Sequence, residues 1–369
     1  MRRAGLLSLT LATTLACGTP DRGAEYGRAF NAAEAAETAG RFGEAAARYD
    51  EAADGAKIPR DGWHARYLAA RALARSGDRA DAAVRLKVIA DASPPVEDSA
   101  EAAYAIAEMQ IDRGDPTGWT ASLGVARRFP SSGIARRALL RTLAHQDETE
   151  GPRATLGTLT SLEPALASTE LAETVGYETA LRLATLGEDA RARDAFVAVA
   201  THWPYPHGVF WDDSLYRASL LDEKLGRYTE AVTDLTRMLG ERESSWLVGS
   251  YERPRFEPAM VRLCALYRDH FHDRAMARAC FERLYTDFTH SELRDDALWE
   301  ESRLSRDAGD AAGACRDLSR MVREFPDSRY TACAVAECPP LASELRDAGA
   351  PGDCHPYLTR FRLGAEAQP

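Results

Sequence analysis

The sequence lacks an excess of positive charge. Only three of its basic residues are lysines, and 46 basic side chains stand against 57 acidic ones, which gives a net charge of -11. Proteins that bind the phosphate backbone of nucleic acids use surplus cations to release counterions. The composition therefore argues against a nucleic acid as the main partner, and against attachment to an anionic membrane surface by charge alone.

Motifs of common catalytic sites are also missing. The sequence contains no glycine-rich phosphate loop, no His-Glu-x-x-His run and no Gly-x-Ser-x-Gly elbow. The densest polar cluster, residues 269–273 with His270 and His272, is interpreted as a solvated turn rather than a metal site. Acidic pairs such as Asp212-Asp213 suit the start of a helix, where they meet its dipole favourably. We predict neither an enzyme nor a bound cofactor or metal.

The apolar run at the N-terminus is too short to span a bilayer. Residues 4–16 follow two arginines and number 13, whereas a spanning helix needs about 20 residues. The run ends at Thr14-Leu15-Ala16-Cys17, which resembles a bacterial lipoprotein signal, although that family usually has leucine at the position of Thr14. The alternatives are an ordinary secretory signal with an incidental cysteine, or an uncleaved anchor.

The resemblance implies that residues 1–16 are removed and that Cys17 carries the lipid. Several acyl chains anchor a protein almost permanently, because each buried methylene contributes about 0.8 kcal/mol. By the same family analogy, Gly18 after the cysteine fits export to the outer membrane, with the protein facing the periplasm. Residues 17–24 would then form a short tether, and the folded part would lie close to the membrane surface.

Turn residues recur along the rest of the chain between Ala-rich amphipathic stretches. Their spacing is 36 to 46 residues, and a fixed period in this range indicates a helical solenoid. We predict an all-α fold of about eight helix-turn-helix units. The expected turns are at Gly40, Gly77, Gly114, Gly151, Gly187, Gly226, His272 and Gly309.

The first unit shows the pattern within a repeat. It predicts a helix over residues 26–39, a turn, and a second helix over residues 44–53, in which Ala45, Tyr49 and Ala52 share one face. Small residues beside larger ones let adjacent helices interlock. Equivalent sets are Ala82, Leu86, Ile89; Ala192, Phe196, Val199; Ala231, Leu235, Met238; Ala277, Phe281, Leu284; and Ala314, Leu318, Met321, whereas units three and four place Trp119 and Ala154 at the packing position.

The phrase Gly-Arg-Phe-x-Glu-Ala-x-x-x-Tyr over residues 40–49 resembles the tetratricopeptide (TPR) repeat, as do residues 226–231. Proline ends several units, in two cases as Phe-Pro-x-Ser at Phe129 and Phe325. This form is similar to TPR units of the outer-membrane protein assembly lipoprotein and of the Tol-Pal coordinator. The resemblance covers residues 25 to 335 approximately. It implies a right-handed TPR-like array over residues 25–330.

Two aromatic segments flank the unit that turns at Gly226, where the repeat spacing is longest. Insertions of this kind map to loops on one face, often the binding face. Aromatic residues frequently dominate binding energy, so one hypothesis makes these segments a partner site. The alternative is that the rings fold back and cap an irregular joint. The residues concerned are Trp203, Tyr205, Trp211, Trp246 and Tyr251.

Six cysteines remain after Cys17, and all follow residue 260. An even number in an exported chain suggests disulfides. Cys264 and Cys280 lie equally far from the turn at His272, so we expect them to be bonded. The other four allow two arrangements: Cys315 with Cys338 and Cys333 with Cys354, or Cys315 with Cys333 and Cys338 with Cys354. Zinc is the less favoured interpretation, because no Cys-x-x-Cys pair occurs.

These features predict a lipid-anchored, periplasmic protein-binding scaffold of the cell envelope, closed by a cysteine-containing cap and tail at residues 331–369. Two other functions stay open at this stage. The chain is also similar to the outer-membrane assembly lipoprotein, although that family has about five repeats and lacks the cysteine-rich end. The second alternative function is the binding of a cell-wall glycan or a small ligand by the aromatic residues.

Overall fold

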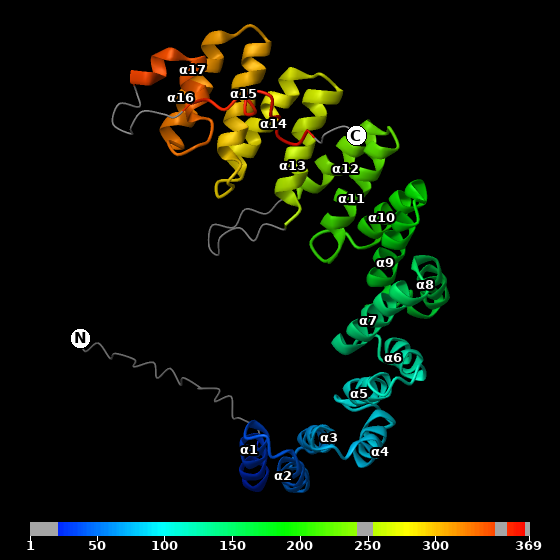
Figure 1. Ribbon diagram of the computed structural model, residues 1–369. Helices are drawn as coiled ribbons and strands as arrows, with labels where there is room; N and C mark the ends of the chain where they lie inside the picture. Colours follow the sequence, from blue (N-terminus) through cyan, green and yellow to red (C-terminus); the bar gives the residue numbers. More distant parts are fainter. Residues whose placement is uncertain (1–20, 242–253, 344–352, 366–369) are drawn as a thin grey trace, which may run out of the picture. The chain divides into compact units, whose positions relative to one another are not determined.

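We describe a computed structural model covering residues 21–241, 254–343 and 353–365. The chain separates into two compact units, residues 1–145 and 146–369. The first unit contains the following helices, of which the last continues into the second unit (Figure 1): α1 Ala24–Thr38, α2 Phe42–Gly55, α3 Pro59–Ser76, α4 Arg79–Ala90, α5 Ser99–Ile111, α6 Thr117–Arg128 and α7 Gly133–Thr149.

In its described residues, the second unit holds ten further α-helices, a π-helical turn (η1) and a short 3-10 helix (η2). They are α8 Pro152–Leu166, α9 Ala172–Thr185, α10 Asp189–His202, α11 Trp211–Lys224, α12 Tyr228–Gly240, α13 Phe256–Ala265, η1 Leu266–His270, α14 Arg274–Asp287, α15 Arg294–Asp307, α16 Ala311–Glu324, α17 Thr331–Glu337 and η2 Pro339–Ser343.

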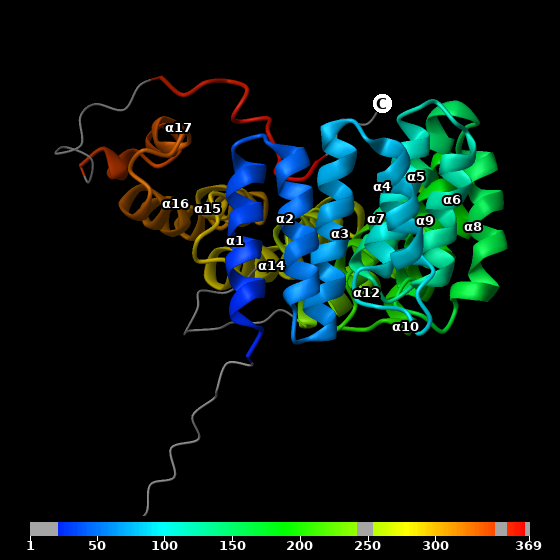
Figure 2. The same ribbon diagram turned by 90° about the horizontal axis from the view of Figure 1, so that it is seen from below.

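The helices pair as helix-turn-helix repeats, from α1 with α2 to α15 with α16, and the prediction of an all-α, TPR-like repeat fold is confirmed. Within each compact unit the packed helices are neighbours in the chain, such as α1 with α2 and α2 with α3 (Figure 2). None of the helices in the described ranges has the length and apolarity that a membrane span requires.

All eight predicted turn residues have a positive φ. The seven glycines lie between 74° and 103°, and His272 has a φ of 51°, the one positive value for a non-glycine residue in the described ranges. An L side chain in this region brings Cβ close to the following carbonyl oxygen, which is why glycine ends most of these helices. At three turns an aspartate follows and caps the next helix with its carboxylate: Asp78, Asp273 and Asp310.

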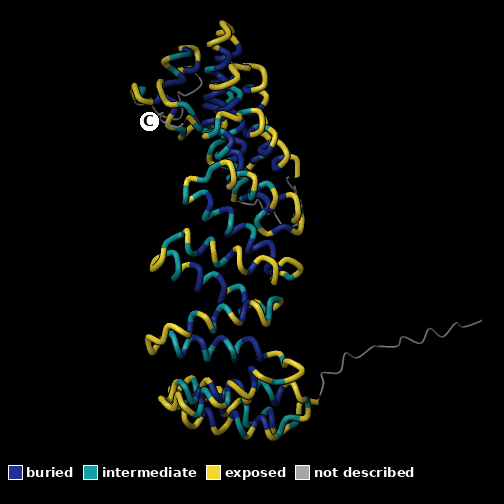
Figure 3. Tube along the Cα trace, turned by 90° about the vertical axis from the view of Figure 1, so that its right-hand side faces the viewer, coloured by how far each residue is buried: buried dark blue, intermediate teal, exposed yellow. Residues whose placement is uncertain are grey.

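The predicted core positions are buried in six of the eight units, and the buried face recurs along the helices (Figure 3). Ala45, Tyr49 and Ala52, for example, are at most 2% exposed. In units three and four the buried residue lies one position from the predicted one, earlier in unit three and later in unit four. Thr155 is fully buried while Ala154 is partly exposed, because α8 begins at Pro152, directly after the turn glycine. Gly118 takes the same role beside Trp119 in unit three.

Two joints between neighbouring repeats contain a buried arginine–aspartate cluster. Arg193 of α10 reaches Asp222 of α11 at 2.9 Å and Asp234 of α12 at 3.7 Å. Arg278 of α14 makes the equivalent contact with Asp317 of α16 at 3.0 Å. Each arginine lies six residues after the turn of its own repeat. The aspartates of α12 and α16 lie eight residues after the turn of the next repeat, so the same contact recurs at equivalent repeat positions.

Burial also perturbs two acids next to these joints. Loss of solvation raises the pKa of Asp234 to about 6, and the positive charge of Arg193 opposes this rise. Glu301 of α15 is 1% exposed, and burial, followed by the nearby charges of Glu282 and Asp317, raises its pKa to about 8. Glu301 therefore holds a proton at neutral pH.

The turn conformation gives the first prediction. Replacing Gly187, with a φ of 74°, by alanine lowers the free energy of unfolding by about 1 kcal/mol, because the backbone conformation is strained for any L side chain. The matched control is Gly157→Ala in the interior of α8, where a methyl group meets nothing within 4 Å. That change raises stability by roughly 0.5–1 kcal/mol. Thermal unfolding of both variants checks the signs, and a stabilised Gly187→Ala would contradict the assigned turn.

The buried acid gives the second prediction. The pKa of Glu301 rises from 4.5 in the unfolded chain to about 8 in the folded chain, so the folded state binds one more proton between these pH values. The stability that Glu301 contributes is therefore complete below pH 4.5 and is lost as the pH rises through 8. Glu301→Gln flattens that decline and raises stability on the order of 2 kcal/mol at alkaline pH. Melting temperatures across this range measure the effect, with exposed Glu163→Gln as control. An unchanged slope in Glu301→Gln would refute the assignment.

Candidate protein-binding surfaces

The predicted aromatic site lies in the segment between α10 and α11. Trp211 is the first residue of α11 and is only 2% exposed, within the core. Tyr205 is partly buried with its ring 5.6 Å from that of Trp211, and Trp203 packs against the core around Phe196. The alternative interpretation therefore describes this joint better: the rings fill it, and Trp211 cannot be a contact residue in the folded chain. Trp246 and Tyr251 lie outside the described residues.

Polar contacts hold the same segment in place. The Phe210 backbone N–H donates to Glu173 of α9 at 2.8 Å, and the Phe210 ring stacks on Tyr177 at 4.1 Å. The Tyr177 hydroxyl donates to Asp213 of α11. Burial, and then this hydrogen bond, raises the pKa of Tyr177 to about 12. These contacts attach the segment to α9 and α11, so its role is structural.

The polar turn at residues 269–273 also has structural contacts. The His270 ring stacks on Tyr228 at 3.5 Å, and Asp273 caps α14. Among the described residues, no group of three His, Cys, Asp or Glu side chains is placed to hold a metal ion.

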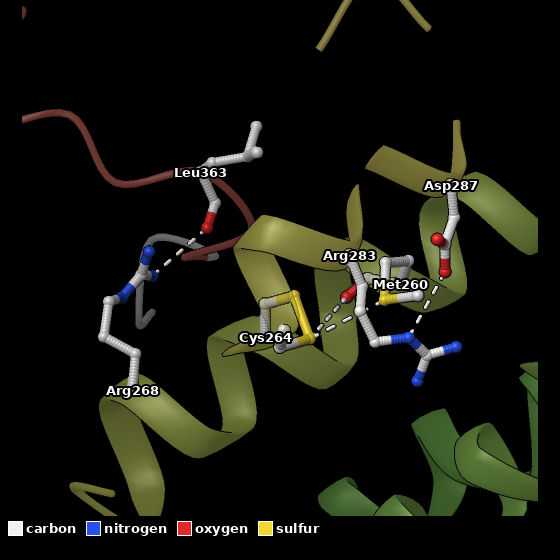
Figure 4. The surroundings of a disulfide bond; sticks show 7 residues. Met260, Cys264, Arg268, Arg283, Asp287 and Leu363 are labelled. Atoms are coloured by element: carbon white, nitrogen blue, oxygen red, sulfur yellow. Dashed lines mark hydrogen bonds and ion pairs between the residues drawn. A yellow bond between two sulfur atoms is a disulfide. The ribbon is translucent and has the colours of Figure 1, made fainter. Parts of the chain in front are cut away.

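The six C-terminal cysteines are joined in pairs. Cys264 of α13 is bonded to Cys280 of α14 across the turn at His272 (Figure 4). Of the two arrangements left open by the sequence, the structure has Cys315 with Cys338 and Cys333 with Cys354. The first bridge closes one helical pair, and the other two attach α17 and the C-terminal segment to the last repeat.

An open groove lies between α1 and α3 in the first compact unit. Its volume is about 790 Å³, and α1 and α3 supply most of its lining. Arg75 of α3 pairs with Glu37 of α1 at 2.5 Å, and the Tyr49 hydroxyl donates to the same carboxylate at 2.9 Å. The rest of the lining combines charge with one apolar side chain: Glu34, Thr38, His64, Leu68 and Arg71.

The electrostatics of this groove depend on a neighbouring helix. His64 donates from Nδ1 to the carboxylate of Asp98, the residue before α5, at 3.0 Å. That hydrogen bond raises the pKa of His64, and partial burial opposes it. Arg71 lies 5.7 Å from the Tyr67 ring centroid and is exposed to the groove. Both signs of charge thus face solvent on one side of α1 and α3.

Sequence reasoning missed this groove because it searched the irregular joints for a site. The regular units carried the available signal. On α3 the core face repeats small residues, while Leu68, Arg71 and Arg75 recur at helical spacing on another face. A partly apolar, charged stripe on a helix whose core face is already accounted for marks a surface open to a partner.

No protein-family model matches the chain, and no curated protein matches it. Among solved structures, the TPR domain of P58(IPK) is similar at 13% identity, over 88% of this chain and all of that domain, with a TM-score of 0.26. An IFIT1 monomeric mutant with Gppp-AAAA has 12% identity over 80% of this chain and 63% of its own, with a TM-score of 0.34. A human IFIT1 dimer with PPP-AAAA has 15% identity, 86% and 73% coverage and a TM-score of 0.30.

The burial of Trp211 yields a third prediction. Trp211→Ala removes a large side chain from the core and lowers the free energy of unfolding by about 3–5 kcal/mol. Trp203→Ala, at a partly exposed position, has a smaller effect. Chemical unfolding of the two variants gives the comparison. Equal and small losses of unfolding free energy in the two variants would show that Trp211 is a surface residue.

Proposed function

We propose that this protein is a lipid-anchored scaffold of the cell envelope that binds a polypeptide along its odd-numbered helices. The groove between α1 and α3 is the observation that carries the proposal. Helical repeats expose extended surfaces of this kind, and the binding specificity comes from side chains outside the core. Here those side chains belong to regular helices, so they are held at fixed spacing.

The chemistry of the groove suits an extended protein segment. Arg71 offers several N–H donors in a planar arrangement that fits carbonyl or carboxylate oxygens. Glu34 offers acceptors for backbone N–H groups, and Leu68 between them supplies apolar contact. A ligand of one charge alone would be repelled by one of these two groups, so a polypeptide of mixed charge is the best match.

The position of the groove in the chain supports a membrane-associated partner. Lipid on Cys17, as the N-terminal motif implies, would attach the chain seven residues before the end of the tether at Ala24. A fully extended segment of that length reaches about 25 Å. The helices that line the groove are the first ones after the tether, so a partner in the groove would lie close to the bilayer. Confinement at a membrane raises the effective concentration of both proteins.

The fourth prediction tests both parts in cells. Chemical cross-linking should join the protein to a discrete partner, and Arg71→Glu should reduce that product about tenfold because the groove loses its exposed donor. Cys17→Ser should move the protein from the membrane fraction to the soluble fraction. Immunoblotting and partner identification by mass spectrometry measure the two effects.

The matched control is Arg153→Glu, an exposed arginine on α8 that is not part of the groove. It should preserve the cross-linked product, and all variants should retain the melting temperature of the parent. Cross-linking that is indifferent to Arg71→Glu would remove the groove from the proposal. Membrane retention of Cys17→Ser would remove the lipid anchor.

A further inference from the structure

The C-terminal segment, residues 353–365, lies across the odd-numbered helices of the last two repeats. Its start is fixed to α17 by the bond between Cys333 and Cys354, and it has no helix of its own. Contacts with α15, η1 and α13 then follow one another along the segment, whose red trace crosses these helices in Figure 1.

Arginine side chains hold the main chain of this segment. Arg303 of α15 donates to the carbonyl oxygens of Phe361 at 2.7 Å and Thr359 at 2.6 Å. Arg268 of η1 donates to the carbonyl oxygen of Leu363 at 3.1 Å, a contact visible in Figure 4. Recognition of carbonyl oxygens is independent of side-chain identity, so this surface holds the main chain of a segment that folds in turns, with backbone hydrogen bonds such as Phe361 N–H to Tyr357.

One buried acid completes the backbone recognition. Glu300 of α15 is 1% exposed and accepts from the Leu363 N–H at 2.8 Å. Its second oxygen lies 2.9 Å from Arg268 and 3.5 Å from Arg362 of the segment itself. The surface therefore provides donors and an acceptor at fixed positions and favours a basic residue before the second anchor.

Two leucines anchor the segment, and most of its other side chains are exposed. Leu358 is 1% exposed and Leu363 is 8% exposed, whereas Tyr357 is 62% exposed. Gly364 follows with a φ of 73°, and a Cβ there would approach Val261 of α13 to 2.8 Å. The surface thus selects two aliphatic side chains five positions apart, with glycine after the second.

The surface continues past the end of the described segment. Beyond Ala365 a groove of about 450 Å³ runs over α13, with Glu257, Val261 and Leu293 in its lining. A longer segment with the same pattern would therefore contact more of this surface than residues 353–365 do. Arg303 lies six residues before the turn of its repeat, and Arg71 in the open groove lies six residues before the turn of the second repeat. The two arginines therefore occupy the same position in their repeats.

We infer that α13, η1 and α15 form a peptide-binding surface that the chain's own C-terminal segment occupies, and that a partner protein displaces it. The partner offers a segment that adopts the same turns, with two aliphatic residues five apart, a basic residue before the second and glycine after it. This inference rests on the proposed function, because it takes the odd-numbered helices as the binding face and adds the chemistry of the partner.

The experiment uses the full chain with its segment released. In Leu358→Asp/Leu363→Asp both anchors become charged, and a fluorescent peptide of residues 355–365 is then titrated by fluorescence anisotropy. The peptide should bind the released variant at least about tenfold more tightly than the parent chain, in which the segment competes. Adding Arg303→Gln should weaken that binding, whereas Arg153→Gln should leave it unchanged.

Three results would overturn the inference. The first is no peptide binding by a released variant that keeps its helical circular dichroism. The second is equal binding by the parent and the released variant. The third is a dimer of the parent chain that the double substitution abolishes, which would assign the surface to a second copy.

A measurement on the parent chain covers the case in which the double variant does not fold. Hydrogen exchange should release the Leu363 amide well before the amides of α15, because a displaceable segment opens without the helices beneath it. Simultaneous exchange would make the segment part of the core and end the proposal. All of these measurements use purified protein, so their failure leaves the cross-linking result at the α1–α3 groove standing.

Discussion

A backbone reversal at a residue with positive φ separates the two helices of every repeat. This constraint fixes the register of everything that follows, because side chains on the next helix are then positioned by their distance from the turn. The small core residue stands five positions after the turn in most units, as at Ala45 and Ala192. The arginine and aspartate that link neighbouring repeats stand six and eight positions after it, as at Arg193 and Asp234.

The regular part of the fold could be predicted because it depends on local spacing alone. Eight turns and the core residues of six units follow from periodicity. The two irregular units were misplaced by one residue, since Pro152 starts its helix early and the pattern gives no warning of that. The extra length before His272 includes the π-helical turn at residues 266–270, whose wider backbone no residue type marks.

The candidate sites were harder to predict, for different reasons. The aromatic segment at Trp203 to Trp211 has the composition of a binding surface, yet the same rings fill a joint, and composition cannot separate these uses. The contacts of Arg303 join residues more than 50 positions apart, beyond any periodic signal. Only the cysteine spacing carried long-range information, because symmetry about a turn brings Cys264 and Cys280 together.

The covalent link between α13 and α14 closes the helical pair whose turn residue, among the eight predicted turns, is not glycine. Cys264 and Cys280 each lie eight positions from His272, so the bond spans the reversal itself. A turn that is held by a disulfide no longer depends on glycine to bring its two helices together. The bond therefore offsets part of the strain of a positive φ, and this turn presents an exposed imidazole where the other turns present glycine.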